Sequence, residues 1–159
     1  MKRILTISLI CFLVLGFIEQ LKGQNIANQQ ISTIEKQVDS IFHSMVKAAE
    51  SLDYNKISKG VDDRYNAGFI TNESYFSKYD SLIYILKTKS QTGARQTISI
   101  QKEKITVLSD SIAILTAFGN SQIELYSGNI FTVKFFWSFV YEKINNNWKV
   151  IQSHQSNNK

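Results

Sequence analysis

The residue of this chain best suited to chemistry lies near its C-terminus, in a segment that runs from Trp148 to Ser156. His154 is one of two histidines in the sequence. An imidazole titrates near neutral pH, so His154 could act as a catalytic acid or base, contact a ligand, or tie the last strand to its neighbours. These three roles stay open at the level of sequence.

An aromatic row precedes this segment. Alternate side chains of a strand share a face, so the row predicts one continuous apolar face. That face exceeds what a thin sheet needs for packing, and we expect part of it to border a cavity. The row consists of Phe131, Val133, Phe135, Trp137, Phe139 and Tyr141.

A two-residue type I′ turn at Asn145 and Asn146 would join the row to the last strand, because asparagine tolerates positive φ. An uninterrupted register then pairs Phe139 with Gln152 and places His154 opposite the next inward residue of the row, Trp137. Gln152 and His154 would therefore lie on the aromatic face. Polar groups within an aromatic wall are typical of a small-molecule pocket.

Other groups with chemical potential have simpler interpretations. Tyr79 could supply a hydroxyl to the cavity from a helix, although such a residue usually packs in the core. Asp53 is interpreted as a turn or capping residue. No carboxylate lies on the aromatic face. Two distant histidines and a single cysteine form a poor ligand set, so we expect neither a metal nor a cofactor.

The elements that would position these groups begin with a long amphipathic helix over residues 31–52, where apolar residues recur at spacings of three and four. Here His43 falls on the solvent face. Residues 53–72 are rich in turn formers and permit a short helix near 54–59 and a short strand near 68–71. Residues 72–74 are expected to cap a second amphipathic helix that ends near Lys89.

From Arg95 onward, apolar and polar residues alternate, and most of the apolar residues are β-branched or aromatic. This pattern predicts a β-sheet. A change of phase indicates a bulge or bend between Gln101 and Lys104. The strand over 111–126 has apolar residues on both faces, which suggests a central strand covered on both sides. A turn at 127–129 leads into the aromatic row. The fold class is therefore α+β.

The N-terminus has the layout of a secretory signal: Lys2 and Arg3, a mostly apolar run over 4–18, and a short polar stretch. The run is shorter than the ~20 residues of a membrane span. We expect residues 1–23 to be a signal peptide cleaved before Gln24, followed by a polar lead over 24–30. Cys11 lies inside the run, which argues against lipidation, so the protein is expected to be periplasmic or secreted without a permanent membrane anchor.

Charge excludes one class of partner. Removing residues 1–23 lowers the net charge from +5 to +3, and the remaining lysines are scattered. A nucleic-acid binder needs a basic stripe, so no nucleic acid is expected as a partner.

The element order, together with Trp148 and the His-x-Ser ending at His154 and Ser156, resembles the nuclear-transport-factor-2-like superfamily, and within it the SnoaL-like exported proteins. The resemblance covers residues 31–157. It implies a cone-shaped curved antiparallel sheet wrapped by a long N-terminal helix and two further helices. It also implies a pocket at the open end and a homodimer across the outer sheet face.

The expected function is binding of a small apolar molecule by Trp137, Phe139, Tyr141, Gln152, His154 and Tyr79. The first alternative is a lyase or isomerase that uses His154 as acid or base, so enzyme activity stays undecided. The second is an assembly module, because the association domain of calcium/calmodulin-dependent kinases shares the tail pattern.

Overall fold

The computed structural model describes residues 28–158 apart from 73 and 91–92. The predicted signal peptide and residues 24–27 of the polar lead lie outside the described residues. None of the described helices is long and apolar enough to cross a membrane. The described elements are α2 (Asn28–Glu50), α3 (Tyr54–Lys59), β1 (Phe69–Thr71), β2 (Ser74–Phe76), α4 (Tyr79–Ser90), β3 (Gly93–Val107), β4 (Ile112–Leu125), β5 (Ile130–Ile144) and β6 (Asn147–Asn158).

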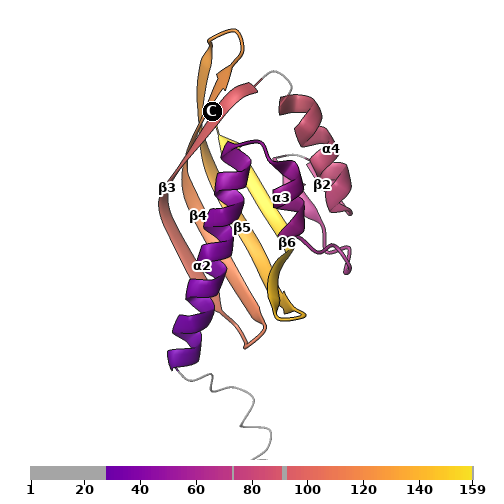
Figure 1. Cartoon of the computed structure of the whole chain (residues 1–159), viewed down its shortest axis with the longest axis vertical. Helices are drawn as coiled ribbons and strands as arrows, with labels where there is room; N and C mark the ends of the chain where they lie inside the picture. The colour runs from indigo at the N-terminus through magenta and orange to yellow at the C-terminus, as the bar shows by residue number, and fades with distance from the viewer. Residues whose placement is uncertain (1–27, 73, 91–92, 159) are drawn as a thin grey trace, which may run out of the picture.

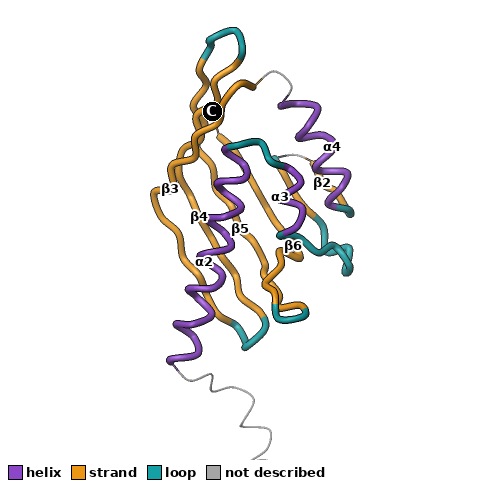
Figure 2. Tube along the Cα trace, viewed as in Figure 1, coloured by secondary structure: helices purple, strands orange, loops and turns teal. Residues whose placement is uncertain are grey.

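The domain has two layers, with the three described helices on one face of a curved six-stranded sheet (Figure 1, Figure 2). The strand order is β2-β1-β6-β5-β4-β3, which confirms the α+β class. The sheet is mixed rather than antiparallel throughout, because β1 pairs parallel with β6. After α3 the chain meets β6 at Val61, beside Val150, and continues along it in the same direction.

Helix α2 crosses the sheet and buries the apolar stripe that its sequence predicts. It begins at Asn28, inside the predicted polar lead, and ends at Glu50. Ile34, Val38 and Phe42 lie in the core, together with Val46 and Ala48. Three further residues of the stripe, Ile41, Met45 and Ala49, are only partly buried.

The caps of the two short helices come from aspartates. Asp53 accepts a hydrogen bond from the Lys56 backbone N–H at 3.0 Å, which confirms its predicted capping role. For α4 the predicted caps at residues 72–74 are wrong, because Ser74 already belongs to β2. The cap is Asp63, whose Oδ2 accepts from the Tyr79 backbone N–H at 3.1 Å.

The bend of the sheet lies where the sequence predicted a bulge or bend. The β3–β4 register shifts between Ile100 and Lys102, which leaves Gln101 as the extra residue. A Cβ on Gly119 would lie 2.0 Å from the Ser99 carbonyl oxygen. Only glycine therefore permits this close approach of β3 and β4.

Strand β4 is central, as predicted, but it is covered on one face only. Its inner face buries Ala113 and Leu115 completely, with 0% exposure. On the opposite face, Ile112 and Ile114 are half-buried. No described helix covers this outer face (Figure 2).

Candidate functional site

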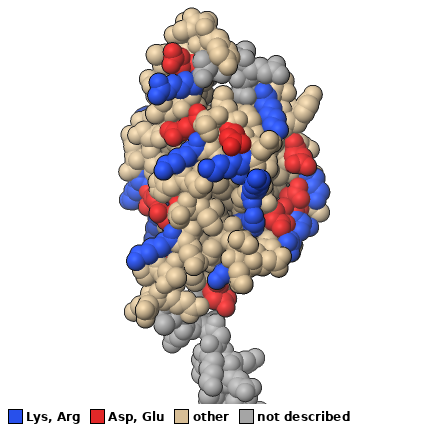
Figure 3. Space-filling view, viewed as in Figure 1, with Lys and Arg blue, Asp and Glu red and all other residues tan. Residues whose placement is uncertain are grey.

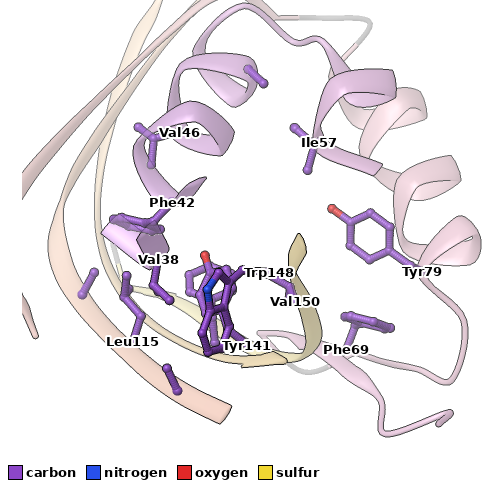
Figure 4. Packing of buried hydrophobic residues seen from close by; sticks show 14 of the residues in the cluster. Val38, Phe42, Val46, Ile57, Phe69, Tyr79, Leu115, Tyr141, Trp148 and Val150 are labelled. Carbon is purple, nitrogen blue, oxygen red and sulfur yellow. The ribbon is translucent and has the colours of Figure 1, made fainter. Parts of the chain in front are cut away.

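A cavity of about 840 Å³ lies between the concave face of the sheet and the helices. Figure 4 shows Val46, Ile57 and Tyr79 on the helices, facing Tyr141 and Val150 on the sheet. All five line the cavity. Met45 and Ala49, two half-buried residues of α2, also line it. The helical stripe therefore serves both the core and the cavity wall.

Strand β5 supplies the aromatic wall, and Trp137, Phe139 and Tyr141 line the cavity as the alternation predicts. The rings of Phe135 and Trp137 stack at 3.9 Å with an interplanar angle of 19°. Phe139 meets Trp137 edge-on at 6.2 Å. At the far end of the row Phe131 is 52% exposed, so the row is not buried over its whole length.

The closing hairpin turns as predicted, with φ of 49° at Asn145 and 62° at Asn146. The predicted register holds as far as the pair of Tyr141 with Val150 and then shifts. Ile151 is the extra residue at this bulge. Because side chains of a strand alternate, one inserted residue reverses the face of everything beyond it.

The predicted pairing of Gln152 and His154 with the aromatic row is therefore wrong. Gln152 pairs with Val140, and His154 pairs with Ser138. Both lie on the outer face, and His154 is exposed.

The residues that take the predicted places are Ser153, opposite Phe139, and Gln155, opposite Trp137. Both line the cavity. The sequence holds one signal of the bulge: the adjacent apolar pair Val150 and Ile151 interrupts the alternation of the last strand.

Tyr79 opens α4 and is 8% exposed. Its ring packs edge-on against Phe69 at 5.0 Å, and its hydroxyl points into the space between α3 and the sheet (Figure 4). Burial raises the pKa of this hydroxyl well above its ordinary value. At neutral pH the hydroxyl is therefore protonated and able to donate a hydrogen bond.

Several other polar atoms at the cavity wall are occupied or shielded, although the half-buried Gln155 side chain also lines the cavity. Gln96 Nε2 donates to Ser121 Oγ at 3.0 Å. The Trp137 Nε1, Tyr141 hydroxyl and Ser153 Oγ atoms have no hydrogen-bond partner and almost no accessible surface. They are therefore closed to a ligand in this structure.

Within the part of the chain that the structure describes, no carboxylate or imidazole lines the cavity, and Arg95 is the one charged lining residue. Arg95 is exposed, as are Asn72, Ser74 and Asn157, so these residues mark the mouth. Apart from Arg95, the described lining therefore consists of aliphatic, aromatic and neutral polar side chains.

A second cluster of titratable groups joins α2 to β3. His43 Nε2 lies 3.2 Å from the Glu103 carboxylate and 3.5 Å from Asp39 Oδ1. Burial, followed by a hydrogen bond with Asp39, raises the pKa of Glu103, while His43 opposes this shift. One nitrogen or oxygen atom from each of the three side chains lies within 4.8 Å of the other two. These contacts account for the three side chains as a hydrogen-bonded cluster. Sequence spacing could not reveal its link to Glu103.

The outer face of the sheet carries an exposed aromatic pair. Phe118 and Phe136 stack at 6.2 Å and are 39% and 53% exposed. Farther along the same face, beyond the Thr116–Ser138 pair, Ile114 pairs with Val140 across the same two strands. On the helical face, by contrast, lysines and arginines alternate with aspartates and glutamates (Figure 3).

Comparison with known proteins agrees with this architecture. Residues 34–159 match the family model of the calcium/calmodulin dependent protein kinase II association domain. No curated protein sequence matches the chain.

Three solved structures illustrate the shared fold. A nuclear transport factor 2-like superfamily protein from Salmonella enterica has a TM-score of 0.72 at 15% identity, covering 81% of this chain and 94% of its own. The association domain of C. elegans CaMKII has a TM-score of 0.64 at 12% identity, with coverages of 79% and 96%. A putative scytalone dehydratase from Novosphingobium aromaticivorans has a TM-score of 0.72 at 6% identity, with coverages of 84% and 89%. At these identities the likeness establishes the nuclear-transport-factor-2-like fold alone.

Proposed function

The chain belongs to the calcium/calmodulin dependent protein kinase II association domain family, and on that premise we propose that it is an exported domain that binds a small, mostly apolar molecule in its cavity. The observation that carries this proposal is the cavity itself, about 840 Å³ within an otherwise packed core. Volumes of this size are typical of small-molecule sites. A domain used only for assembly would have no need of such a space.

The composition of the wall supports the chemistry of this ligand. Helices and sheet contribute mainly aliphatic and aromatic side chains, and burial of apolar surface supplies most of the binding free energy. The exposed polar residues of the lining, among them Asn72, Ser74 and Arg95, lie at the mouth. A ligand with an apolar body that enters fully and a more polar end that faces outward fits this distribution.

Native mass spectrometry of the purified protein and titration with the apolar fluorophore N-phenylnaphthylamine test the proposal. We expect saturable binding of one fluorophore per chain. Ala49→Phe, which adds a ring at the half-buried cavity wall, should weaken this binding at least tenfold. Ser44→Phe adds the same ring to the exposed face of α2 and should leave binding unchanged. Equal binding to both variants would refute a ligand site in the cavity.

Self-association is a second candidate function, favoured by the outer face of the sheet. Phe118 and Phe136, with Ile114 and Val140 beyond the Thr116–Ser138 pair, form a mainly apolar patch there, hereafter the outer patch, which no described helix covers. A solved relative of the same fold is an association domain by name. The outer patch would pack against the same patch of a second copy in an isologous homodimer.

Light scattering after size-exclusion chromatography tests this candidate. We expect the wild-type protein to be a dimer and Phe136→Lys to be a monomer, because the lysine would place a charge in the contact. Tyr126→Lys is the control, since Tyr126 is 75% exposed at the β4–β5 turn, away from the outer patch. A wild-type monomer, or a dimer that survives Phe136→Lys, would contradict the proposal.

The alternative of a lyase or isomerase with His154 as acid or base lacks structural support. His154 lies on the sheet face opposite the cavity, so it could not reach a ligand held there. The resemblance to a putative dehydratase concerns fold only.

A further inference from the structure

The Tyr79 hydroxyl is a polar group that the fold holds inside an apolar part of the cavity. Tyr79 makes a backbone hydrogen bond with Asp63 and a ring contact with Phe69, and neither contact uses the hydroxyl. Figure 4 shows the oxygen directed into the space opposite Ile57. An apolar ligand that excludes water from this position must offer the hydroxyl an acceptor, because a polar group left unpaired costs free energy.

Two contacts fix where this hydroxyl points. The Asp63 carboxylate holds the first backbone N–H of α4 at 3.1 Å. The ring itself lies edge-on against Phe69, at 5.0 Å and 65°, and Phe69 is fully buried. A donor locked in this way loses little conformational entropy when a ligand binds, so its hydrogen bond can discriminate between ligands.

The charges around the cavity exclude ionic ligands at this position. Arg95 is the one charged residue among the described lining residues, and it is exposed at the mouth. A carboxylate or ammonium placed beside Tyr79 would be desolvated without a counter-charge, which is costly. A neutral acceptor oxygen carries no charge, so placing it beside Tyr79 avoids the free-energy cost of desolvating an ion.

Resting on the proposed function, we infer that the cavity selects neutral, mostly apolar molecules that carry a carbonyl-type oxygen, and that Tyr79 donates a hydrogen bond to that oxygen. The apolar body of such a molecule packs against the aromatic wall of β5. The assignment makes Tyr79 the residue that determines specificity, whereas the wall determines affinity.

Tyr84 offers a matched control for this assignment. It lies on the same helix as Tyr79, is 70% exposed, and is not among the residues that line the cavity. Tyr84→Phe and Tyr79→Phe therefore remove the same atom type from the same residue type. Only the second change removes a donor that faces the cavity.

The experiment is displacement of N-phenylnaphthylamine by three compounds of similar shape: benzophenone, diphenylmethane and diphenylacetate. In wild-type protein, benzophenone should bind more tightly than diphenylacetate. Tyr79→Phe should weaken benzophenone binding roughly fivefold, the worth of one net hydrogen bond, and leave diphenylmethane within a factor of about two. Tyr84→Phe should alter neither. Thermal melts of both variants check that the fold is retained.

The failures of the two proposals are distinguishable. If N-phenylnaphthylamine does not bind the wild-type protein saturably, the proposed function fails and the inference falls with it. If the fluorophore binds but Tyr79→Phe leaves the ratio of benzophenone to diphenylmethane affinity unchanged, the cavity binds ligands and the role of Tyr79 is refuted. Tighter binding of diphenylacetate than of benzophenone would refute the preference for neutral ligands.

Discussion

Gly119→Ala should destabilise the protein strongly, because the added methyl has no space at the bend of the sheet. The Cβ would lie 2.0 Å from the Ser99 carbonyl oxygen, 2.8 Å from Phe135 Cζ and 3.0 Å from Ile100 Cα. Two of these three atoms belong to the backbone of β3, so a side-chain rotation cannot relieve the clash. Strand β3 would have to move away from β4 by about an ångström.

The cost can be estimated. Overpacking typically destabilises by about 1 to 3 kcal/mol, and a clash with backbone belongs at the upper end, about 3 kcal/mol. With an unfolding entropy of about 2.1 cal/mol/K per residue, a domain of this size should lose roughly 10 °C in Tm. Differential scanning calorimetry measures this shift.

Gly128→Ala is the matched control. Gly128 has a positive φ of 83°, and a Cβ there would meet nothing within 4 Å. Its substitution therefore carries only the backbone cost of the left-handed region, about 1 kcal/mol, or roughly 3 °C. If Gly119→Ala lowers Tm no more than Gly128→Ala does, the steric account of the bend is refuted.

Three further predictions concern the hairpin, the cluster of Asp39, His43 and Glu103, and the N-terminus. Asn146 has a φ of 62°, so Asn146→Gly should leave Tm unchanged or raise it slightly. Asn146→Val should lower the free energy of unfolding by about 1 to 2 kcal/mol. Calorimetry that gives the valine variant a higher Tm than the wild type would contradict this. Burial is the first cause of the raised pKa of Glu103, so the folded protein favours the protonated carboxyl more than the unfolded chain does. The contribution of Glu103 to the free energy of unfolding is therefore greatest below the pKa that it has in the unfolded chain. That contribution declines as the pH rises through the pKa that it has in the folded protein. Urea unfolding of Glu103→Gln between about pH 4 and pH 7 should therefore show a smaller loss of stability with rising pH than the wild type, and parallel curves would argue against the shift. Exported protein should begin near Gln24, and N-terminal sequencing that finds Met1 would contradict the proposed signal peptide.

Local patterns predicted the elements whose residues need only their neighbours in sequence. The spacing of Ile34, Val38 and Phe42 is sufficient to identify α2, because a helix places residues three and four apart on one face whatever surrounds it. The paired asparagines likewise identify the hairpin turn, since the positive φ is a property of each residue. The fold class follows from the order of these elements.

The candidate site depended on long-range contacts and was predicted only in part. The aromatic face of Trp137, Phe139 and Tyr141 is in place, since alternation alone decides it. The partners from β6 were predicted wrongly, because the bulge at Ile151 reverses the strand and places Ser153 where Gln152 was expected.

What the sequence by itself determined is the helices, every strand except β2 (Ser74–Phe76), and the apolar side of each as far as the bulge in β6, because these follow from backbone geometry and residue spacing. The tertiary structure alone decided the parallel pairing of β1 with β6, the capping of α4 by Asp63, the meeting of His43 with Glu103, and the face on which His154 lies. Each of these joins residues far apart in the chain. A shift of one residue in strand register leaves the local propensities unchanged, yet it moves each side chain beyond the shift to the opposite face of the sheet.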